Sequence, residues 1–380
     1  MTVKKNQVDL KERDWRYNRI RKAMAKEDLD GILAFVPAWR REDVCYLTAA
    51  ALESSFALAY LPISGEPAAF VGSLEDVVAV RNAGFVDDIR LTSLLGLEGV
   101  ADRIKSDMAK GRIGIAGAEF LPHATWKHLE SQLPGFKFKN ATPMITSIRW
   151  VKSEWEVAQM RHTGTICDAA WAAFLEACQP GVTEFEIIAE VEARLRGMGA
   201  EDNFMLIASG GDEVMGMTPP SDRKLQIGDM VRTELTPQCR GYWMQICRTA
   251  VIGEPSAGQR ESFELFDAAT AAGIAAVKPG ATMHDVAMAE NDVFRERGFG
   301  QYCTSEYTRV RGHGLGLHLD EVPVLEGIDT ILEENSVLVV HPNTFTPLAG
   351  YHVLGDPVVV TATGAEKLIS TPRILDVVPV

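Results

Sequence analysis

The chain has 380 residues, of which 46% are apolar, and a formal net charge of −14. This length predicts two domains, and the composition is typical of a globular protein. The negative charge argues against a nucleic-acid partner, because phosphate binding needs clustered Lys and Arg. No apolar run is long enough to span a membrane, and the N-terminus lacks an apolar signal core, so we expect a cytoplasmic protein.

The first part of the chain is predicted to be an α/β domain, because strand-like and helix-like segments alternate along it. The predicted strands cover 31–36, 44–47, 56–61, 68–71 and 112–116. The predicted helices cover 11–28, 75–82, 97–109 and 124–132. A boundary near residue 150 divides the chain into domains 1–150 and 151–380.

The second domain is predicted to contain two similar units, 154–198 and 257–297. Each unit has a long helix that stops at a Pro-Gly pair, followed by a second helix that begins after a Thr. Strands follow each unit. Pro-Gly is common after helices, so the repeat alone is a hint of internal duplication. It indicates a pseudo-symmetric α+β domain.

The six cysteines are scattered along the chain, and no two of them form a Cys-x-x-Cys pair. This spacing argues against a zinc ribbon and against a disulfide framework. We therefore expect free thiols, most of them buried.

The segment Arg311-Gly-His-Gly-Leu-Gly-Leu-His-Leu-Asp-Glu-Val-Pro323 resembles the histidine motif of the creatinase / aminopeptidase P / methionine aminopeptidase ("pita-bread", M24-like) family. Other stretches resemble that family in the same order, and together they cover most of the chain: Trp150-Val-Lys-Ser153, Gln179-Pro-Gly181, Leu225-Gln-Ile-Gly-Asp-Met230, Arg248-Thr249, Val340-His-Pro342 and Gly355-Asp-Pro357. The resemblance implies an α+β protein with a creatinase-like α/β N-terminal domain followed by a pita-bread domain. It also implies a homodimer.

The metallopeptidases of that family hold two metal ions with two Asp, one His and two Glu. The corresponding positions here are Glu234, Gln245, His313, His341 and Gly355. One carboxylate cannot offset the charge of two dications, so we expect no metal cofactor. The chain then resembles the metal-independent creatine- and ectoine-hydrolysing members. A single iron or zinc ion held by two His and one carboxylate, namely His313, His341 and Glu234, remains open as an alternative.

By this resemblance, His313 and His341 are expected to act as general acid and base, because imidazole titrates near neutral pH. Glu234 is expected to act as a nucleophile or a water-activating base, or to bind a cationic group of the substrate. A surface ion pair is its structural alternative. His318 is a further catalytic candidate, because it lies two residues before Asp320, where the peptidases have a second histidine.

Four residues are expected to bind substrate: Gln245, Arg248, His352 and Asp320. Gln245 can orient a substrate without adding charge. Arg248 can clamp a carboxylate, but pairing within the sheet is the favoured role. A core position is likewise favoured for His352. Cys247 is expected to be a buried thiol on the face opposite Gln245.

The leading functional hypothesis is a metal-independent hydrolase of a non-peptide C–N bond in a small guanidine, amidine or amide. One alternative is a mononuclear metal-dependent hydrolase, or a lyase similar to dimethylsulfoniopropionate lyases. Another is a Xaa-Pro peptidase homologue that has lost peptidase activity and acts as a binding module. Each hypothesis expects a small molecule as the partner rather than a nucleic acid or a membrane.

Overall fold

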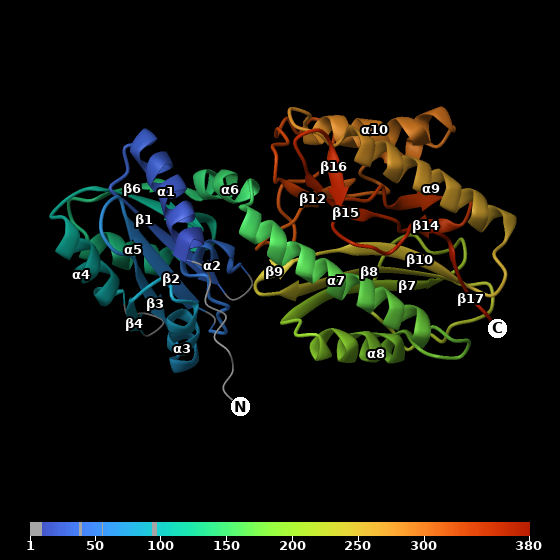
Figure 1. Cartoon of the computed structure of the whole chain (residues 1–380), viewed down its shortest axis with the longest axis horizontal. Helices are drawn as coiled ribbons and strands as arrows, with labels where there is room; N and C mark the ends of the chain where they lie inside the picture. Colours follow the sequence, from blue (N-terminus) through green and yellow to red (C-terminus); the bar gives the residue numbers. More distant parts are fainter. Residues whose placement is uncertain (1–9, 38–39, 55, 93–96) are drawn as a thin grey trace. The chain divides into compact units, whose positions relative to one another are not determined.

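The computed structural model describes residues 10–37, 40–54, 56–92 and 97–380. The chain divides into two compact units, Met1–Trp150 and Val151–Val380 (Figure 1). No helix among the described residues is long and apolar enough to cross a membrane.

The first unit is built on a six-stranded sheet with the strand order β4-β3-β2-β1-β5-β6. Its strands are β1 (Gly31–Pro37), β2 (Phe56–Pro62), β3 (Ala68–Val71), β4 (Asp88–Leu91), β5 (Arg112–Ala116) and β6 (Lys137–Asn140). Its helices are α1 (Leu10–Lys26), α2 (Glu42–Thr48), α3 (Leu74–Ala83), α4 (Glu98–Asp107), α5 (His123–Gln132) and α6 (Thr142–Trp150), with a 3-10 turn η1 (Ala118–Phe120). Strand β2 runs antiparallel to both of its neighbours, whereas β5 runs parallel to β1 and β6.

The strand predicted over 44–47 is wrong, because this segment lies in helix α2. Val44, Tyr46 and Leu47 are all buried there. A short apolar run has no periodicity that separates a buried helix from a buried strand. The acidic residues Glu42 and Asp43 lie in the first helical turn, where negative charge favours a helix.

The second unit holds three sheets. Their orders are β17-β10-β8-β7 with β9 beside β8, β11-β12-β15-β16, and the hairpin β13-β14. The strands are β7 (Asp202–Gly210), β8 (Met230–Cys239), β9 (Tyr242–Trp243), β10 (Ile246–Ile252), β11 (Gly312–Gly314), β12 (Val337–Val340), β13 (Thr344–Thr346), β14 (Gly350–His352), β15 (Asp356–Val360), β16 (Ala365–Lys367) and β17 (Asp376–Val378).

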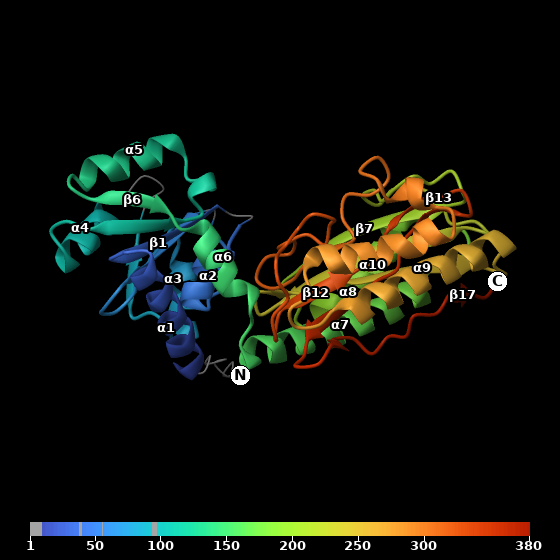
Figure 2. The same cartoon turned by 90° about the horizontal axis from the view of Figure 1, so that it is seen from above.

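Four long helices cover these sheets: α7 (Glu154–Ala177), α8 (Glu184–Gly197), α9 (Ala257–Ala276) and α10 (Met283–Glu296), and a 3-10 turn η2 (Gly300–Cys303) follows α10. Within this unit, α7 packs with α8 and α9 packs with α10 (Figures 1 and 2). Each helix begins with a capping box whose first residue is Ser153, Thr183, Ser256 or Thr282. The same local signal therefore opens both helix pairs. The pseudo-symmetric α+β domain is confirmed.

One backbone bridge joins the two larger sheets. Cys247 on β10 pairs with Gly355, with N···O distances of 3.4 and 3.0 Å in the two directions. The hydrophobic core continues across this joint, since it contains Leu235 and Ile246 from one sheet and Val339 from the other. Side chains from both halves of the repeat are thereby brought together.

No disulfide joins any of the six cysteines in the described part of the chain, and four of them are buried. The prediction of free thiols is confirmed. Burial raises the pKa of the Cys167 and Cys247 thiols well above the ordinary value. These cysteines therefore contribute to packing as uncharged side chains.

Candidate functional site

Glu234 lies in the middle of β8, opposite Cys247 of β10. Its Oε1 accepts a hydrogen bond of 2.8 Å from Asn343 Nδ2. Among the described residues no Lys or Arg forms an ion pair with this carboxylate. Burial raises the pKa of Glu234, although the bond from Asn343 opposes the shift. A half-buried acid that forms no ion pair in the described part of the chain is costly, which marks Glu234 as a candidate binding group.

His313 on β11 and His341 after β12 lie side by side. Their ring centroids are 5.4 Å apart and the rings are steeply inclined, at 72°. His313 Nδ1 lies 3.1 Å from the carbonyl oxygen of Gly314, so Nδ1 donates and Nε2 is left as an acceptor. Neither ring nitrogen of His341 has a hydrogen-bond partner among the described residues. Burial lowers the pKa of both imidazoles, that of His341 strongly, so both are neutral near pH 7.

Gln245 precedes β10 and is buried. Its Nε2 donates to Cys247 Sγ over 3.5 Å, and its Oε1 has no partner in the described part of the chain. The prediction that Cys247 faces away from Gln245 is therefore wrong, because residues two apart in an extended chain share a face. The prediction that Cys247 is a buried thiol is confirmed.

Arg248 points into the joint between the sheets. It donates to the carbonyl oxygens of Cys247 (2.8 Å), Gly355 (2.7 Å) and Thr371 (3.1 Å), and to Asp356 Oδ1 (2.7 Å). Its side chain is fully buried. These contacts favour a role in holding the sheets together over a substrate clamp.

His352 is fully buried beneath α9. Its Nδ1 lies 2.9 Å from the hydroxyl of Ser262, and its ring stacks on Phe266 with a centroid distance of 4.6 Å. Burial lowers the pKa of His352 to about 3. These contacts favour the core role rather than substrate binding.

Asp320 and His318 lie in the loop that follows β11, which we call the His313 loop (residues 314–323). Asp320 Oδ2 pairs with Arg309 over 2.8 Å, and its Oδ1 lies 3.9 Å from His313 Nδ1. His318 is half-buried in the same loop. The loop thus brings one acid beside His313.

We use the name Glu234 site for five residues: Glu234, Gln245, His313, His341 and Asn343. Asn343 was not predicted from the sequence. Its Nδ2 holds Glu234, and its Oδ1 accepts a bond of 3.0 Å from the amide of Leu354. The sequence offered one signal for Asn343: its carboxamide follows the candidate His341 by two residues, in a segment rich in apolar side chains.

The donors of this site do not fit the two-metal centre that the family resemblance implies. At Gly355 an added Cβ would lie 2.4 Å from His341 Cβ and 2.6 Å from the carbonyl oxygen of Val340, so the backbone leaves no room for a ligand side chain. In the described residues no group of three or more His, Cys, Asp or Glu is placed to hold a metal ion. The three-ligand iron or zinc site at Glu234, His313 and His341 is therefore not formed either.

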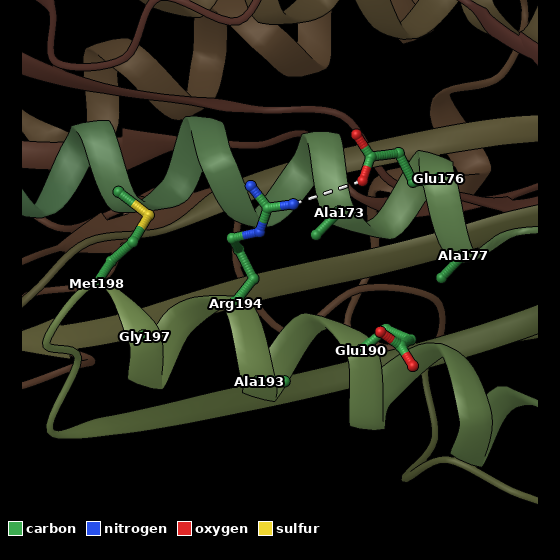
Figure 3. A pocket seen from close by; sticks show the side chains of 8 residues that line it. All are labelled: Ala173, Glu176, Ala177, Glu190, Ala193, Arg194, Gly197 and Met198. Atoms are coloured by element: carbon green, nitrogen blue, oxygen red, sulfur yellow. Dashed lines mark ion pairs between the residues drawn. The ribbon is translucent and has the colours of Figure 1, made fainter.

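Residues of α7, α8 and the position after α8 line a groove between these two helices (Figure 3). Small side chains and one ion pair, Arg194 with Glu176 at 3.5 Å, line much of it. Both partners of that pair are well exposed. None of the predicted site residues lines the groove, so it does not compete with the Glu234 site as the place of chemistry.

The sequence profile of metallopeptidase family M24 matches residues 158–362, which is more than half of the chain. That of the creatinase/prolidase N-terminal domain matches residues 16–151. The chain therefore belongs to metallopeptidase family M24.

Individual relatives are named for peptidases. The chain is 28% identical to a Xaa-Pro dipeptidase of Pyrococcus horikoshii over 92% of this chain and 95% of that protein. It is 31% identical to the Xaa-Pro dipeptidase of Pyrococcus furiosus over 62% of this chain and 68% of that protein. The P. horikoshii prolidase structure superposes with a TM-score of 0.82 at 25% identity, covering 95% of this chain and 99% of the other. The structure of dipeptidase PepE from Mycobacterium ulcerans also superposes with a TM-score of 0.82 at 25% identity, covering 99% of this chain and 100% of the other.

These comparisons correct several expectations. The family is right, but a particular closeness to its metal-independent creatinase-like members is not supported, because the relatives are named Xaa-Pro dipeptidases. The main hypothesis of a hydrolase of non-peptide C–N bonds is contradicted by the same names. The expectation of no cofactor is contradicted by a family described as metallopeptidases. The donor set of this chain nevertheless departs from that description, because Gln245 and Gly355 stand where the family resemblance implies carboxylates.

Proposed function

We propose that this protein is a Xaa-Pro peptidase homologue that has lost peptidase activity and binds a short peptide of the Xaa-Pro class at the Glu234 site. The observation that carries the proposal is the backbone at Gly355, which leaves no room for a ligand side chain. The names of the relatives support the ligand class. The neighbouring changes to Gln245 and His341 support the loss of activity.

The chemistry of the site suits the charged amino end of such a peptide. Among the residues that the structure describes, the Glu234 carboxylate forms no ion pair and the Gln245 side-chain carbonyl oxygen has no hydrogen-bond partner. A neutral His341 adds an acceptor nitrogen. A primary ammonium group has three N–H donors and no acceptor, so it is chemically complementary to these acceptor groups. The residues first predicted to be catalytic are thus proposed to bind ligand, with His318 and Asp320 at the edge of the site.

Calorimetric titration with Ala-Pro and Gly-Pro tests the binding step, and N-acetyl-Ala-Pro serves as the ligand control. We expect micromolar binding of the free dipeptides and much weaker binding of the acetylated one. Glu366→Gln is the matched protein control, because Glu366 forms an exposed ion pair with Arg161 and lies outside the site. Absence of binding by every dipeptide would contradict the proposed function.

Proline release by the same preparation tests the loss of peptidase activity. The assay is run after incubation with Mn²⁺, Co²⁺, Zn²⁺ or Fe²⁺, with elemental analysis of the protein alongside. We expect no turnover in any condition. Release of proline at an ordinary enzymatic rate, about 1 per second or faster, would overturn the proposal.

A homodimer and a cytoplasmic location remain predictions from the sequence. Light scattering coupled to size exclusion measures the first directly. One chain per particle at micromolar concentration would contradict it.

A further inference from the structure

A buried ion pair outside the Glu234 site joins the start of α7 to the His313 loop. Lys152 Nζ lies 2.8 Å from Glu321 Oε2, and the two side chains are 1% and 3% exposed. A pair taken out of water gains little net stability, because desolvation offsets most of the attraction. Such a pair can instead fix the conformation of the two segments that carry it, namely the start of α7 and the His313 loop.

The Lys152 end is fixed to a rigid element. Its backbone amide donates to the carbonyl oxygen of Asn335 over 3.1 Å. The next residue, Ser153, caps α7, a helix of 24 residues. Lys152 therefore offers a fixed charge to whatever segment its side chain reaches.

The Glu321 end closes the His313 loop. The amide of Glu321 donates to the carbonyl oxygen of Gly314 over 3.0 Å, and the amide of Gly314 donates to Val322 over 2.8 Å. The same carbonyl of Gly314 accepts the ring proton of His313. A shift of Glu321 would therefore disturb the atom that orients the His313 ring.

The loop backbone also packs directly on the pair. A Cβ at Gly316 would lie 3.0 Å from Glu321 Oε1 and 3.1 Å from Lys152 Cε. The carbonyl oxygen of Gly316 accepts a bond of 2.8 Å from the amide of Trp243. Oδ1 of the neighbouring Asp320 lies 3.9 Å from His313 Nδ1. The ion pair, the loop and His313 thus form one connected arrangement.

We infer that Lys152 and Glu321 are positioning residues, whose buried ion pair holds the His313 loop so that His313 stays oriented beside His341 for ligand binding. The inference rests on the proposed function for its ligand. The conformation of the loop can be measured without any ligand, so the two can fail separately.

The test compares Lys152→Met with Arg16→Met. Arg16 forms an equally buried ion pair with Glu12 in the first unit, at 2.6 Å with exposures of 1% and 4%. Hydrogen exchange of the Gly314 and Glu321 amides reports the loop, and calorimetry reports the Kd for Ala-Pro. We expect Lys152→Met to speed exchange and weaken binding by about tenfold or more. Arg16→Met should lower the melting temperature without either change.

Lys152→Met removes the cation beside the buried Glu321 carboxylate and can prevent folding, so a second variant removes both charges. In K152M/E321L the interior stays neutral, and a folded protein is expected. Loop exchange should remain fast and binding weak in this variant. Slow exchange, or an unchanged Kd despite fast exchange, would overturn the inference. If the unmodified protein binds no dipeptide, the proposed function fails, and the exchange rates alone decide whether the pair fixes the loop.

Discussion

Asp356 and Glu234 are both acids on strands of the second unit, Asp356 fully buried and Glu234 half-buried, yet their surroundings are opposite. Asp356 is fully buried and pairs with Arg248 (2.7 Å), Lys367 (3.0 Å) and Arg373 (2.8 Å). Burial alone would raise the pKa of Asp356, but these charges lower it. Glu234 has an amide in place of three cations, and burial raises its pKa. The difference separates an acid that completes the fold from one that is left available for a ligand.

The largest effect is expected from Asp356→Asn. The substitution leaves the buried Arg248 and the partly exposed Lys367 and Arg373 beside an uncharged amide. Breaking a buried ionic cluster in this way costs about 3–5 kcal/mol of unfolding free energy. Denaturant titration measures it, with Glu366→Gln at an exposed pair as the control. A loss below about 1 kcal/mol would show that the cluster is not the anchor of this joint.

Glu234→Gln should separate binding from stability. The amide keeps the shape and can still accept from Asn343, but it removes the charge that faces the ligand. We expect the Kd for Ala-Pro to rise by about tenfold to a hundredfold, as for the loss of a charged hydrogen bond of 1.5–3 kcal/mol. Unchanged affinity would remove Glu234 from the site.

The pH dependence of this variant sharpens the same comparison. The folded-state pKa of Glu234 is raised above its ordinary value of 4.5, so its contribution to stability is present below pH 4.5 and is lost as the pH rises through the folded-state pKa. The difference in unfolding free energy, Glu234→Gln minus the unmodified protein, should therefore increase as the pH rises over this window. Parallel curves would contradict the raised pKa.

Gly355→Ala tests the closed backbone. Its methyl group would meet His341 Cβ at 2.4 Å and the Val340 carbonyl oxygen at 2.6 Å, so β12 and β15 must shift. Overpacking of this kind costs about 1–3 kcal/mol. Gly364→Ala is the matched control, because nothing lies within 4 Å of its added Cβ. Equal melting temperatures for the two variants would refute the crowding.

The smallest effect is expected from Arg161→Met, which breaks the exposed pair with Glu366. Both side chains are nearly half exposed, at 44% and 50%. Solvent and salt screen such pairs, so a change below about 1 kcal/mol is expected. A larger loss in high salt would mean that the Arg161 stem contributes through packing.

Local signals in the sequence predicted much of the fold. The Pro-Gly stops and the helix starts at Thr183 and Thr282 act within a few residues, so their pattern is visible in the chain itself. Helix α2 escaped prediction because seven residues hold too few turns for a period to show. Motif order identified the family because it covers most of the chain.

The site was harder to predict, because its contacts join distant segments. The bond from Asn343 to Glu234 spans 109 residues, and the Gly355 bridge to Cys247 joins two different sheets. The roles first assigned to Arg248 and His352 could not be chosen until their partners were known. The missing carboxylates were visible in the sequence, but their absence did not identify the substrate class.

The closeness of Gly355 to His341 also limits which side chains position 355 can accept. A Glu at position 355 needs space that the backbone of β12 already occupies. Opening that space strains the pairing of Val340 with Asp356, the acid that anchors three cations. A carboxylate ligand at position 355 therefore requires further changes that move Val340 and His341 away from it.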